Sequence, residues 1–243
     1  MNKIVIVTGG SRGIGAATSK RLAADGYAVC VNYRTRADAA DQVVAEIRAQ
    51  GGDAFACRAD VSVEDDVIRL FNATEAEFGA MTHLVNNAGV LFTQSRLVDM
   101  DVDRFNNVMT ANVTSCFLCC REAVKRMKRG GAIVNVSSAA ARTGSPFEYV
   151  DYAASKGAMD TLTKGLSLEV AADGIRVNAV RPGFIYTDIH ADGGDPDRVD
   201  RLSPQIPLRR GGTVDEVANA IAWLLSDEAS YVTGSFIDLA GGK

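Results

Sequence analysis

A buried strand that runs into a glycine-rich turn opens the chain and constrains its fold more than any other feature. Residues 3–8 are rich in β-branched side chains and lack the polar alternation of a strand with one wet face. Glycines recur through residues 9–15, and residues 16–24 then place apolar side chains at helical spacing. A strand, a glycine turn and a helix in this order form a unit that binds phosphate at the helix N-terminus. A plain tight turn is the alternative, because the spacing is G-x-x-x-G-x-G, with Thr18 in place of the third glycine of G-x-G-x-x-G.

Further apolar runs, separated by stretches of helical periodicity, extend this pattern through the chain. We expect strands at residues 3–8, 27–33, 54–58, 83–89, 132–136, 175–180 and 235–239. We expect helices at residues 16–24, 37–50, 62–78, 102–128, 152–172 and 213–225, of which the third and the last begin with capping-box patterns, Ser62-x-x-Asp65 and Thr213-x-x-Glu216. Strands that alternate with helices favour one α/β domain over residues 1–243. We expect a doubly wound, Rossmann-like sheet of seven mainly parallel strands with helices on both faces.

One long segment does not fit the alternation of strands and helices. Residues 187–207 have no clear periodicity and contain two glycines and three prolines. A loop of this length inside a compact domain more often closes over a site than merely joins two elements. We therefore expect a substrate lid at 187–207.

Charge, hydropathy and cysteine content exclude several classes of protein. A net charge of −4 and a pI near 5.3 argue against nucleic acid or an anionic membrane as a partner. No apolar run approaches the ~20 residues of a membrane span. The apolar stretch within residues 1–10 is too short for a secretory leader, so we expect a cytoplasmic protein. The five cysteines lie among apolar residues without histidines at metal-binding spacing, which predicts buried free thiols and no metal site.

The end of the second predicted strand indicates the type of cofactor. A unit that binds NAD usually has a carboxylate here to hold the ribose 2′-hydroxyl, but this chain has Asn32, Tyr33 and Arg34, followed by Arg36. An arginine at this point can clamp a 2′-phosphate, and Arg12 in the glycine turn can supply a second cation. The pattern favours NADP(H) and leaves NAD(H) possible, since Arg34 and Arg36 can also be solvated cations of a loop.

Tyr152 and Lys156 are four residues apart in a predicted helix, so their side chains lie on one face. The free pKa of tyrosine is about 10, and a nearby ammonium group stabilises the phenolate and lowers that pKa. The pair therefore suits a tyrosine that gives and takes protons, although such pairs are also common on helix surfaces. Asn112 is another candidate, because asparagine is disfavoured inside a helix.

Several motifs occur in the order and at the approximate spacing of one known family. They are Thr8-Gly9-x-x-x-Gly13-Ile14-Gly15, Asn86-Asn87-Ala88-Gly89, Ser138, Tyr152-x-x-x-Lys156 and Pro182-Gly183. Over essentially its whole length the chain resembles the classical short-chain dehydrogenases/reductases. Within that family it is similar to glucose 1-dehydrogenase-like and 3-oxoacyl-acyl-carrier-protein reductase-like members. The resemblance implies an oxidoreductase acting on a carbonyl or secondary alcohol, and a homotetramer joined through residues 102–128 and 152–172.

The resemblance also implies a role for each matching residue. Tyr152 would be the general acid/base, Lys156 would lower its pKa and hold the nicotinamide ribose, and Ser138 would bind the substrate carbonyl oxygen. Asn112 would hold a water molecule in a proton relay. The implied cofactor contacts are Gly9, Ser11, Arg12, Gly13, Ile14, Gly15, Asn32, Tyr33, Arg34, Asp60, Val61, Asn87, Ala88, Gly89, Tyr152, Lys156, Pro182, Gly183, Ile185 and Thr187. For Asn87 a purely structural role, tying strand ends together, is an equal alternative.

The chain departs from the family pattern near the predicted site. Ser138 and Tyr152 are fourteen residues apart, one more than is common, which predicts an insertion in the loop between them. Ser137 competes with Ser138 for the catalytic role, whereas Tyr149 has no lysine four residues later. His190 lies in the predicted lid, where we expect a solvated side chain rather than a substrate contact.

Three functional hypotheses follow from these patterns. The first is an NADP(H)-dependent enzyme that transfers hydride between nicotinamide and a carbonyl or secondary alcohol. The second is an NAD-dependent sugar dehydrogenase of the glucose type, and the third is a non-catalytic dinucleotide-binding regulator. The complete catalytic set speaks against the third. We expect residues 91–96, 139–149 and 186–207 to choose the substrate, but their mixed polarity does not identify it.

Overall fold

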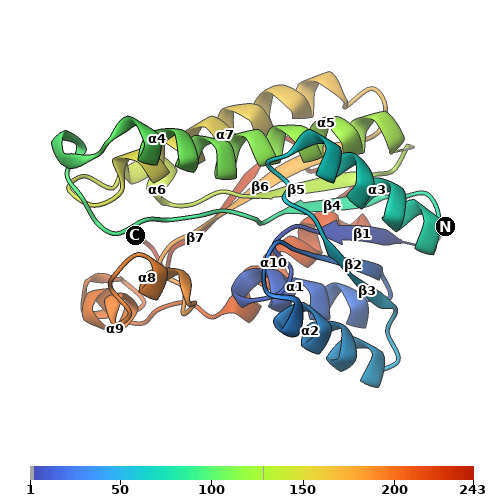
Figure 1. Ribbon diagram of the computed structural model, residues 1–243, viewed down its shortest axis with the longest axis horizontal. Helices are drawn as coiled ribbons and strands as arrows, with labels where there is room; N and C mark the ends of the chain where they lie inside the picture. The colour runs from blue at the N-terminus through green and yellow to red at the C-terminus, as the bar shows by residue number, and fades with distance from the viewer. Residues whose placement is uncertain (1–2, 128) are drawn as a thin grey trace.

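The computed structural model describes residues 3–127 and 129–243, and a parallel sheet forms its centre (Figure 1). The strands are β1 Ile4–Val7, β2 Ala28–Tyr33, β3 Ala54–Arg58, β4 His83–Asn86, β5 Ala132–Val136, β6 Arg176–Pro182 and β7 Phe236–Leu239. Their order is β3-β2-β1-β4-β5-β6-β7, and all neighbouring pairs are parallel. The predicted seven-stranded Rossmann-like sheet is therefore confirmed. Because the strand order reverses between β1 and β4, the carboxyl ends of these strands flank the crevice where such sheets bind ligands.

Helices cover both faces of the sheet (Figure 1). One face carries α1 Gly13–Ala24, α2 Ala37–Ala49 and α10 Val214–Leu225, and the other carries α3 Glu64–Phe78, α4 Val102–Met109, α5 Ser115–Arg126 and α7 Val150–Glu169. Successive residues of β1 point into opposite cores, Val5 and Val7 into the first and Ile4 and Ile6 into the second. Burial of each such side chain contributes on the order of 1.5–3 kcal/mol. A strand covered on both faces leaves no position for polar alternation.

Two predicted helix starts differ in outcome. At α10 the capping box is present, since Thr213 Oγ1 accepts from Glu216 N at 3.2 Å and Glu216 Oε2 accepts from Thr213 N at 2.8 Å. At α3 the predicted box at Ser62 is wrong, and the N-cap position is Val63. The Ser62 hydroxyl is held toward a carboxylate instead of the helix amides, since the hydroxyl and the amide of Ser62 both donate to Asp60 Oδ1, at 2.6 and 3.0 Å.

The helix predicted at 102–128 is interrupted. A π-helical turn, Thr110–Thr114, separates α4 from α5. The predicted end at Lys128 lies outside the described residues. Asn112 is the buried residue within the π turn, and its side-chain amide bonds to chain segments outside this helix. Single π turns of this kind often occur at functional sites.

The segment predicted as a lid contains regular structure. Residues 187–207 include two short helices, α8 Ile189–Asp192 and α9 Arg198–Leu202, which Figure 1 shows apart from the two helix layers. Helices of four or five residues are too short to produce an apolar period in the sequence. The ion pair between Arg12 and Asp192, at 2.8 Å, joins this segment to the glycine turn.

The loop between β5 and α7 also contains a short helix, α6 Ala140–Thr143. The backbone then takes left-handed conformations at Gly144, Ser145 and Phe147. Phe147 has φ of +66° and is 75% exposed, so its ring gains little from burial. The extra residue predicted between Ser138 and Tyr152 therefore lies within a tightly wound loop.

The cysteines are free thiols, four of them buried, as predicted, whereas Cys57 is only half-buried. Among residues 3–127 and 129–243, no group of His, Cys, Asp or Glu side chains is arranged to hold a metal ion. The same ranges contain no helix with the length and hydrophobicity to cross a membrane.

Candidate active site

Two adjoining cavities open at the carboxyl ends of the strands. One has a volume of about 440 Å³ and is lined by Ser138, Tyr152 and Lys156. The other has a volume of about 390 Å³ and is lined by the glycine turn and the ends of β2 and β3. Residues common to both walls are Ile14, Asn87, Gly89, Thr187 and Ile189. A long ligand that spans both cavities would place one end beside Tyr152 and the other beside the end of β2.

Lys156 is buried next to Tyr152. Its Nζ donates to the carbonyl oxygen of Val136 at 2.8 Å and lies 5.5 Å from the centroid of the Tyr152 ring. The side chain is 3% exposed, and burial lowers its pKa from 10.5 to about 8. The lysine therefore remains mostly charged at neutral pH.

The ionisation of Tyr152 differs from the sequence-based expectation. Burial raises its pKa to about 12, and a hydrogen bond with the Ser138 side chain acts in the opposite direction. We expected Lys156 to lower this pKa, but Nζ faces the ring and bonds to the carbonyl of Val136. In this arrangement Tyr152 is a neutral phenol, which is the form that donates a proton.

The geometry separates the two neighbouring serines. Ser137 is 3% exposed, and its hydroxyl donates to the carbonyl oxygen of Lys156 at 3.3 Å. The Ser138 hydroxyl instead lies beside the Tyr152 side chain, whose pKa it lowers, donates to the carbonyl oxygen of Pro182 at 3.5 Å and accepts from the amide of Ala140 at 3.1 Å. Ser138 therefore has the arrangement needed to share a substrate oxygen with Tyr152.

Asn112 is fully buried and does not line either cavity. Its Oδ1 accepts from the amide of Val90 at 2.7 Å, while Nδ2 donates to Val90 O at 3.1 Å and to Ser155 Oγ at 3.0 Å. These bonds join the π turn to the segment after β4 and to α7. The side chain is thus fully engaged within the protein.

The glycine turn forms a cradle that suits a phosphate group. The N-cap residue of α1, Arg12, provides no side-chain cap, so the amides of the first turn are not occupied by it. A Cβ on Gly15 would lie 2.2 Å from the carbonyl oxygen of Gly9, and one on Gly9 would lie 3.1 Å from Cα of Ala88. Glycine thus permits a close approach of the turn, the helix and the end of β4. Open amides at a helix N-terminus fit the phosphates of a dinucleotide.

The end of β2 places cations at the far end of the second cavity. Arg34 is mostly exposed and lies 3.7 Å from Asp60, while Arg36 pairs with Asp38 at 3.4 Å. Asn32 is buried, and its side chain accepts from Gly9 N at 3.2 Å and donates to Ala59 O at 3.1 Å. Asn32 therefore holds the turn in place, whereas Arg34 is available to a ligand.

Asn87 has the structural role that the sequence left open, and it also lies where a cofactor contact is expected. Its Nδ2 donates to the carbonyl oxygens of Thr8 and Gly9, each at 3.0 Å, which ties the ends of β1 and β4 together. Asn87 also lines both cavities. The neighbouring Asn86 faces the core, where its Nδ2 donates to Asn135 Oδ1 at 2.9 Å.

Most of the predicted site residues lie along these cavities. The second cavity is lined by Gly9, Ser11, Arg12, Gly13, Ile14, Asn32, Tyr33, Arg34, Asp60, Val61, Asn87, Ala88, Gly89 and Thr187. The first is lined by Ser138, Tyr152, Lys156, Pro182, Gly183 and Ile185. Gly15 and Asn112 lie behind the walls. The sequence reasoning missed Phe184, Ala240 and Lys243, which also line the first cavity. Only Phe184 carried a signal, because it lies between Gly183 and Ile185, two residues that the family resemblance implies as cofactor contacts.

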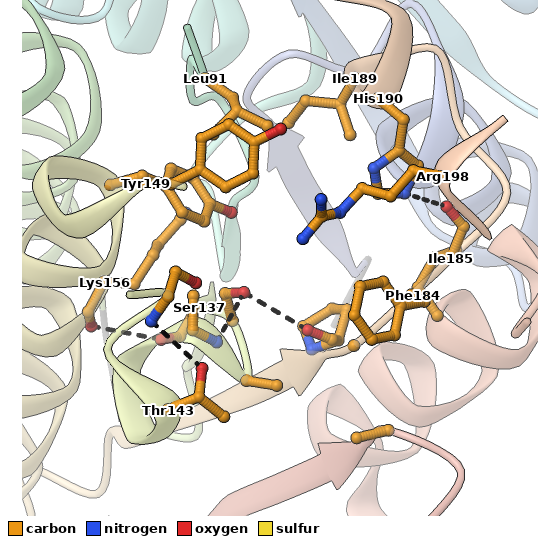
Figure 2. Close-up of a pocket in the computed structure, with 18 of the residues that line it drawn as sticks. Leu91, Ser137, Thr143, Tyr149, Lys156, Phe184, Ile185, Ile189, His190 and Arg198 are labelled. Atoms are coloured by element: carbon orange, nitrogen blue, oxygen red, sulfur yellow. Dashed lines mark hydrogen bonds between the residues drawn. The ribbon is translucent and has the colours of Figure 1, made fainter. Parts of the chain in front are cut away.

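The outer wall of the first cavity comes from the segment 187–207 and the loop before α7. Figure 2 shows Arg198 reaching into the space between Tyr149 and Phe184. Arg198 donates to Glu148 Oε1 at 2.9 Å, and the Tyr149 hydroxyl donates to Gly193 O at 3.4 Å. These contacts hold the segment against the loop before α7.

The expectation of a solvated His190 is wrong. The side chain is 9% exposed, and its Nε2 bonds to the carbonyl oxygen of Ile185 at 2.9 Å (Figure 2). Burial lowers the pKa of His190, so the ring is neutral near pH 7. The short helix α8 folds the imidazole inward, which a segment without a periodic pattern did not reveal.

Comparisons with known proteins agree over the whole chain. A family model described as enoyl-(acyl carrier protein) reductase matches residues 9–243. The uncharacterized oxidoreductase YgfF of Escherichia coli is 62% identical, with 99% of each chain covered. The 3-oxoacyl-[acyl-carrier-protein] reductase FabG of Staphylococcus epidermidis is 40% identical, with 100% of this chain and 99% of the relative covered. A crystal structure of a short chain dehydrogenase from Burkholderia cenocepacia in complex with NADP has a TM-score of 0.92 and 34% identity, with 99% of this chain and 97% of that chain covered.

Proposed function

The chain belongs to the classical short-chain dehydrogenase/reductase family, and from that premise we propose that it is an NADP(H)-dependent oxidoreductase acting on a carbonyl or secondary alcohol group. The observation that carries the proposal is that the two cavities adjoin and share wall residues. Tyr152, Ser138 and Lys156 lie in one, and the glycine turn and Arg34 lie in the other. A dinucleotide lying across Asn87 and Thr187 would bring its nicotinamide to the catalytic side chains.

The side chains at the site suit transfer of a proton to a carbonyl oxygen. Bound NADPH would supply the hydride that reduces the carbonyl carbon. As negative charge grows on the carbonyl oxygen, Tyr152 Oη donates its proton and Ser138 Oγ donates a hydrogen bond. The ammonium group of Lys156 would stabilise the phenolate that remains once it turns from the Val136 carbonyl, where it does not lower the pKa of the neutral phenol. Oxidation of an alcohol uses the same groups in the opposite direction.

Replacement of the proton donor tests the catalytic proposal. Wild-type protein and Tyr152→Phe are assayed for NADPH consumption with a panel of ketones, aldoses and β-ketoacyl thioesters. We expect turnover in the wild type and a loss of at least about 10³-fold in the variant, with NADPH affinity nearly unchanged. Tyr27→Phe is the control, because Tyr27 is a buried tyrosine that lines neither cavity and the variant retains the proton donor. Equal rates for wild type and Tyr152→Phe would refute the assignment.

Arg34 supports NADP(H) as the preferred cofactor. It is the cation at the end of β2, its side chain is 61% exposed, and Asp60 contacts it only at 3.7 Å. A 2′-phosphate would give it a charge-assisted partner. We expect Arg34→Ala to weaken NADPH binding by about 10- to 100-fold, which corresponds to 1.4–2.8 kcal/mol. NADH, which lacks this phosphate, serves as the control ligand. Equal affinity of the wild type for NADH and NADPH would instead favour an NAD-dependent sugar dehydrogenase.

Self-association is a separate part of the proposal. Val102 and Phe105 on α4, Phe117 on α5 and Leu168 on α7 are exposed apolar side chains. Their burial between copies of the chain supports the homotetramer that the family resemblance implies. Light scattering of the purified protein tests this state, and a monomer at assay concentration would contradict it.

A further inference from the structure

We propose that Arg104 is a positioning residue for Tyr152, an inference that rests on the proposed function. Arg104 lies in the first turn of α4 and does not line either cavity. Its guanidinium group joins three parts of the protein that meet at the site. They are α4 itself, the segment after β4 and the first turn of the catalytic helix α7.

The contact with α7 is a buried ion pair beside the catalytic residue. Arg104 Nε donates to Asp151 Oδ2 at 2.7 Å, and Nη2 lies 3.5 Å from Oδ1. The side chains of Arg104 and Asp151 are 16% and 1% exposed. Asp151 Oδ1 also accepts from the backbone amide of Tyr152 at 2.9 Å. The carboxylate thereby fixes the first turn of α7, where the N-cap residue Tyr149 offers no side-chain cap.

The contact with the segment after β4 fixes a wall of the substrate cavity. Arg104 Nη1 donates to the carbonyl oxygen of Thr93 at 2.7 Å, and the guanidinium lies 5.8 Å from the centroid of the Phe92 ring. Leu91, in the same segment, lines the cavity that contains Tyr152. One planar group therefore sets the spacing between the substrate wall and the catalytic helix.

Arg104 acts together with a second tie from the same helical unit. Asn112 bonds to Val90 at one end of the segment and to Ser155 on α7. The two ties reach α7 on either side of Tyr152, at residues 151 and 155. Two attachments along one helix restrict its rotation as well as its translation. The hydroxyl of Tyr152 is therefore held in a defined direction.

Loss of this geometry should lower the rate of the chemical step. Displacement of a reacting group by about 1 Å can cost roughly 100-fold in rate. Arg104→Lys keeps the positive charge beside Asp151, but a single ammonium cannot reproduce the fork that reaches both Asp151 and Thr93. We expect kcat to fall about 10- to 100-fold, while the KM for NADPH stays within about two-fold of wild type.

The chain offers a closely matched control. Arg126 on α5 pairs with Glu122 at 2.6 Å, with the two side chains 17% and 8% exposed, and lies 5.7 Å from the centroid of the Phe71 ring. Arg126→Lys removes a guanidinium of similar burial that is not in contact with the site. We expect similar losses of thermal stability in the two variants and a fall in kcat only for Arg104→Lys.

A double variant separates positioning from the cost of a buried charge. Arg104→Met with Asp151→Asn removes both charges, and such replacements are often neutral for stability. The asparagine oxygen can still accept from the amide of Tyr152, but the bridge to α4 is gone. We expect a stable protein whose kcat remains reduced by 10-fold or more. A double variant with the wild-type kcat would overturn the proposal, as would equal kcat losses in Arg104→Lys and Arg126→Lys.

A readout independent of turnover distinguishes this proposal from the proposed function. The chain has six tyrosines, and ¹³Cζ-tyrosine NMR resolves them once Tyr152→Phe identifies the resonance of Tyr152. We expect that resonance to shift or broaden in Arg104→Lys and to stay unchanged in Arg126→Lys. No movement in Arg104→Lys would overturn the positioning role. Absence of wild-type turnover on the whole substrate panel would instead refute the proposed function.

Discussion

Replacing Lys156 by methionine is expected to stabilise the folded protein at neutral pH while abolishing turnover. Burial lowers the pKa of Lys156 from 10.5 to about 8. The folded state therefore binds this proton less tightly than the unfolded state does. The difference corresponds to about 3 kcal/mol, which the charged lysine costs in full below pH 8. The cost declines as the pH rises from 8 to 10.5. In this range the folded-state lysine is already neutral, and the unfolded state progressively loses the proton that favoured it.

The hydrogen bond made by Lys156 offsets part of this gain. Nζ donates to the carbonyl oxygen of Val136 at 2.8 Å, and such a bond contributes about 1 kcal/mol. Methionine fills a similar volume without a charge. The net gain in the free energy of unfolding is therefore about 2 kcal/mol at pH 7. This net gain should fall to nearly zero at pH 9.5. At that pH the remaining cost of the wild-type lysine is about as large as the contribution of its hydrogen bond.

Urea unfolding followed by circular dichroism at pH 7 and pH 9.5 measures this difference. Lys164→Met is the control, since Lys164 is an exposed lysine on the same helix. We expect the control to show no gain that depends on pH. The reasoning is refuted if Lys156→Met is less stable than wild type at pH 7, or if its advantage is the same at both pH values. Loss of turnover in the variant is measured with the best substrate from the panel.

Three further predictions follow from backbone geometry and burial. Gly15→Ala should weaken NADPH binding more than tenfold, because the new Cβ would lie 2.2 Å from the carbonyl oxygen of Gly9. The control is Gly165→Ala, at a helix position with open space around it, and calorimetry should show that this variant binds NADPH normally. Burial lowers the pKa of His83 from 6.5 to about 4, so the protein should lose up to about 3 kcal/mol of stability as the pH falls from 6.5 to 4. Urea titrations of His83→Asn should lack that part of the pH dependence, and an unchanged profile would contradict it. Phe147→Asn should stabilise the protein by up to about 1 kcal/mol, because asparagine tolerates φ of +66° better. A lower melting temperature would argue against stored strain at this position.

The sheet was predictable because each strand is defined by its own residues. A strand buried on both faces must be apolar at successive positions, as residues 4–7 are, and glycines mark where the chain turns. The pairing of Tyr152 with Lys156 on one face also follows from local spacing alone. These features need no information about distant parts of the chain.

The features that the sequence did not reveal depend on partners far away in the chain. Ser62 does not cap α3 because its hydroxyl is directed at Asp60 rather than at the amides of the helix, and the ring of His190 is turned inward, where the carbonyl of Ile185 accepts from it. The raised pKa of Tyr152 reflects the burial of its side chain, and Lys156 is engaged by the carbonyl of Val136, which lies in a distant part of the chain. The spacing of residues 152 and 156 carries no information on the burial of Tyr152 or on the hydrogen-bond partner of Lys156. Local patterns thus predicted which groups would meet, but not how each would ionise or cap.

The π turn between α4 and α5 sets the angular relation between two halves of one helical element. An α-helix advances about 100° per residue, so the one extra residue of a π turn offsets the side chains after it by about that angle. With this offset α4 presents Arg104 to Asp151, while α5 presents Cys116, Cys119 and Cys120 to the core. In an uninterrupted helix of the same sequence, either Arg104 would point away from Asp151 or the three cysteines would point away from the core. In the positioning role that we propose for Arg104, a change of one residue in the length of this element would therefore disturb the alignment of Tyr152.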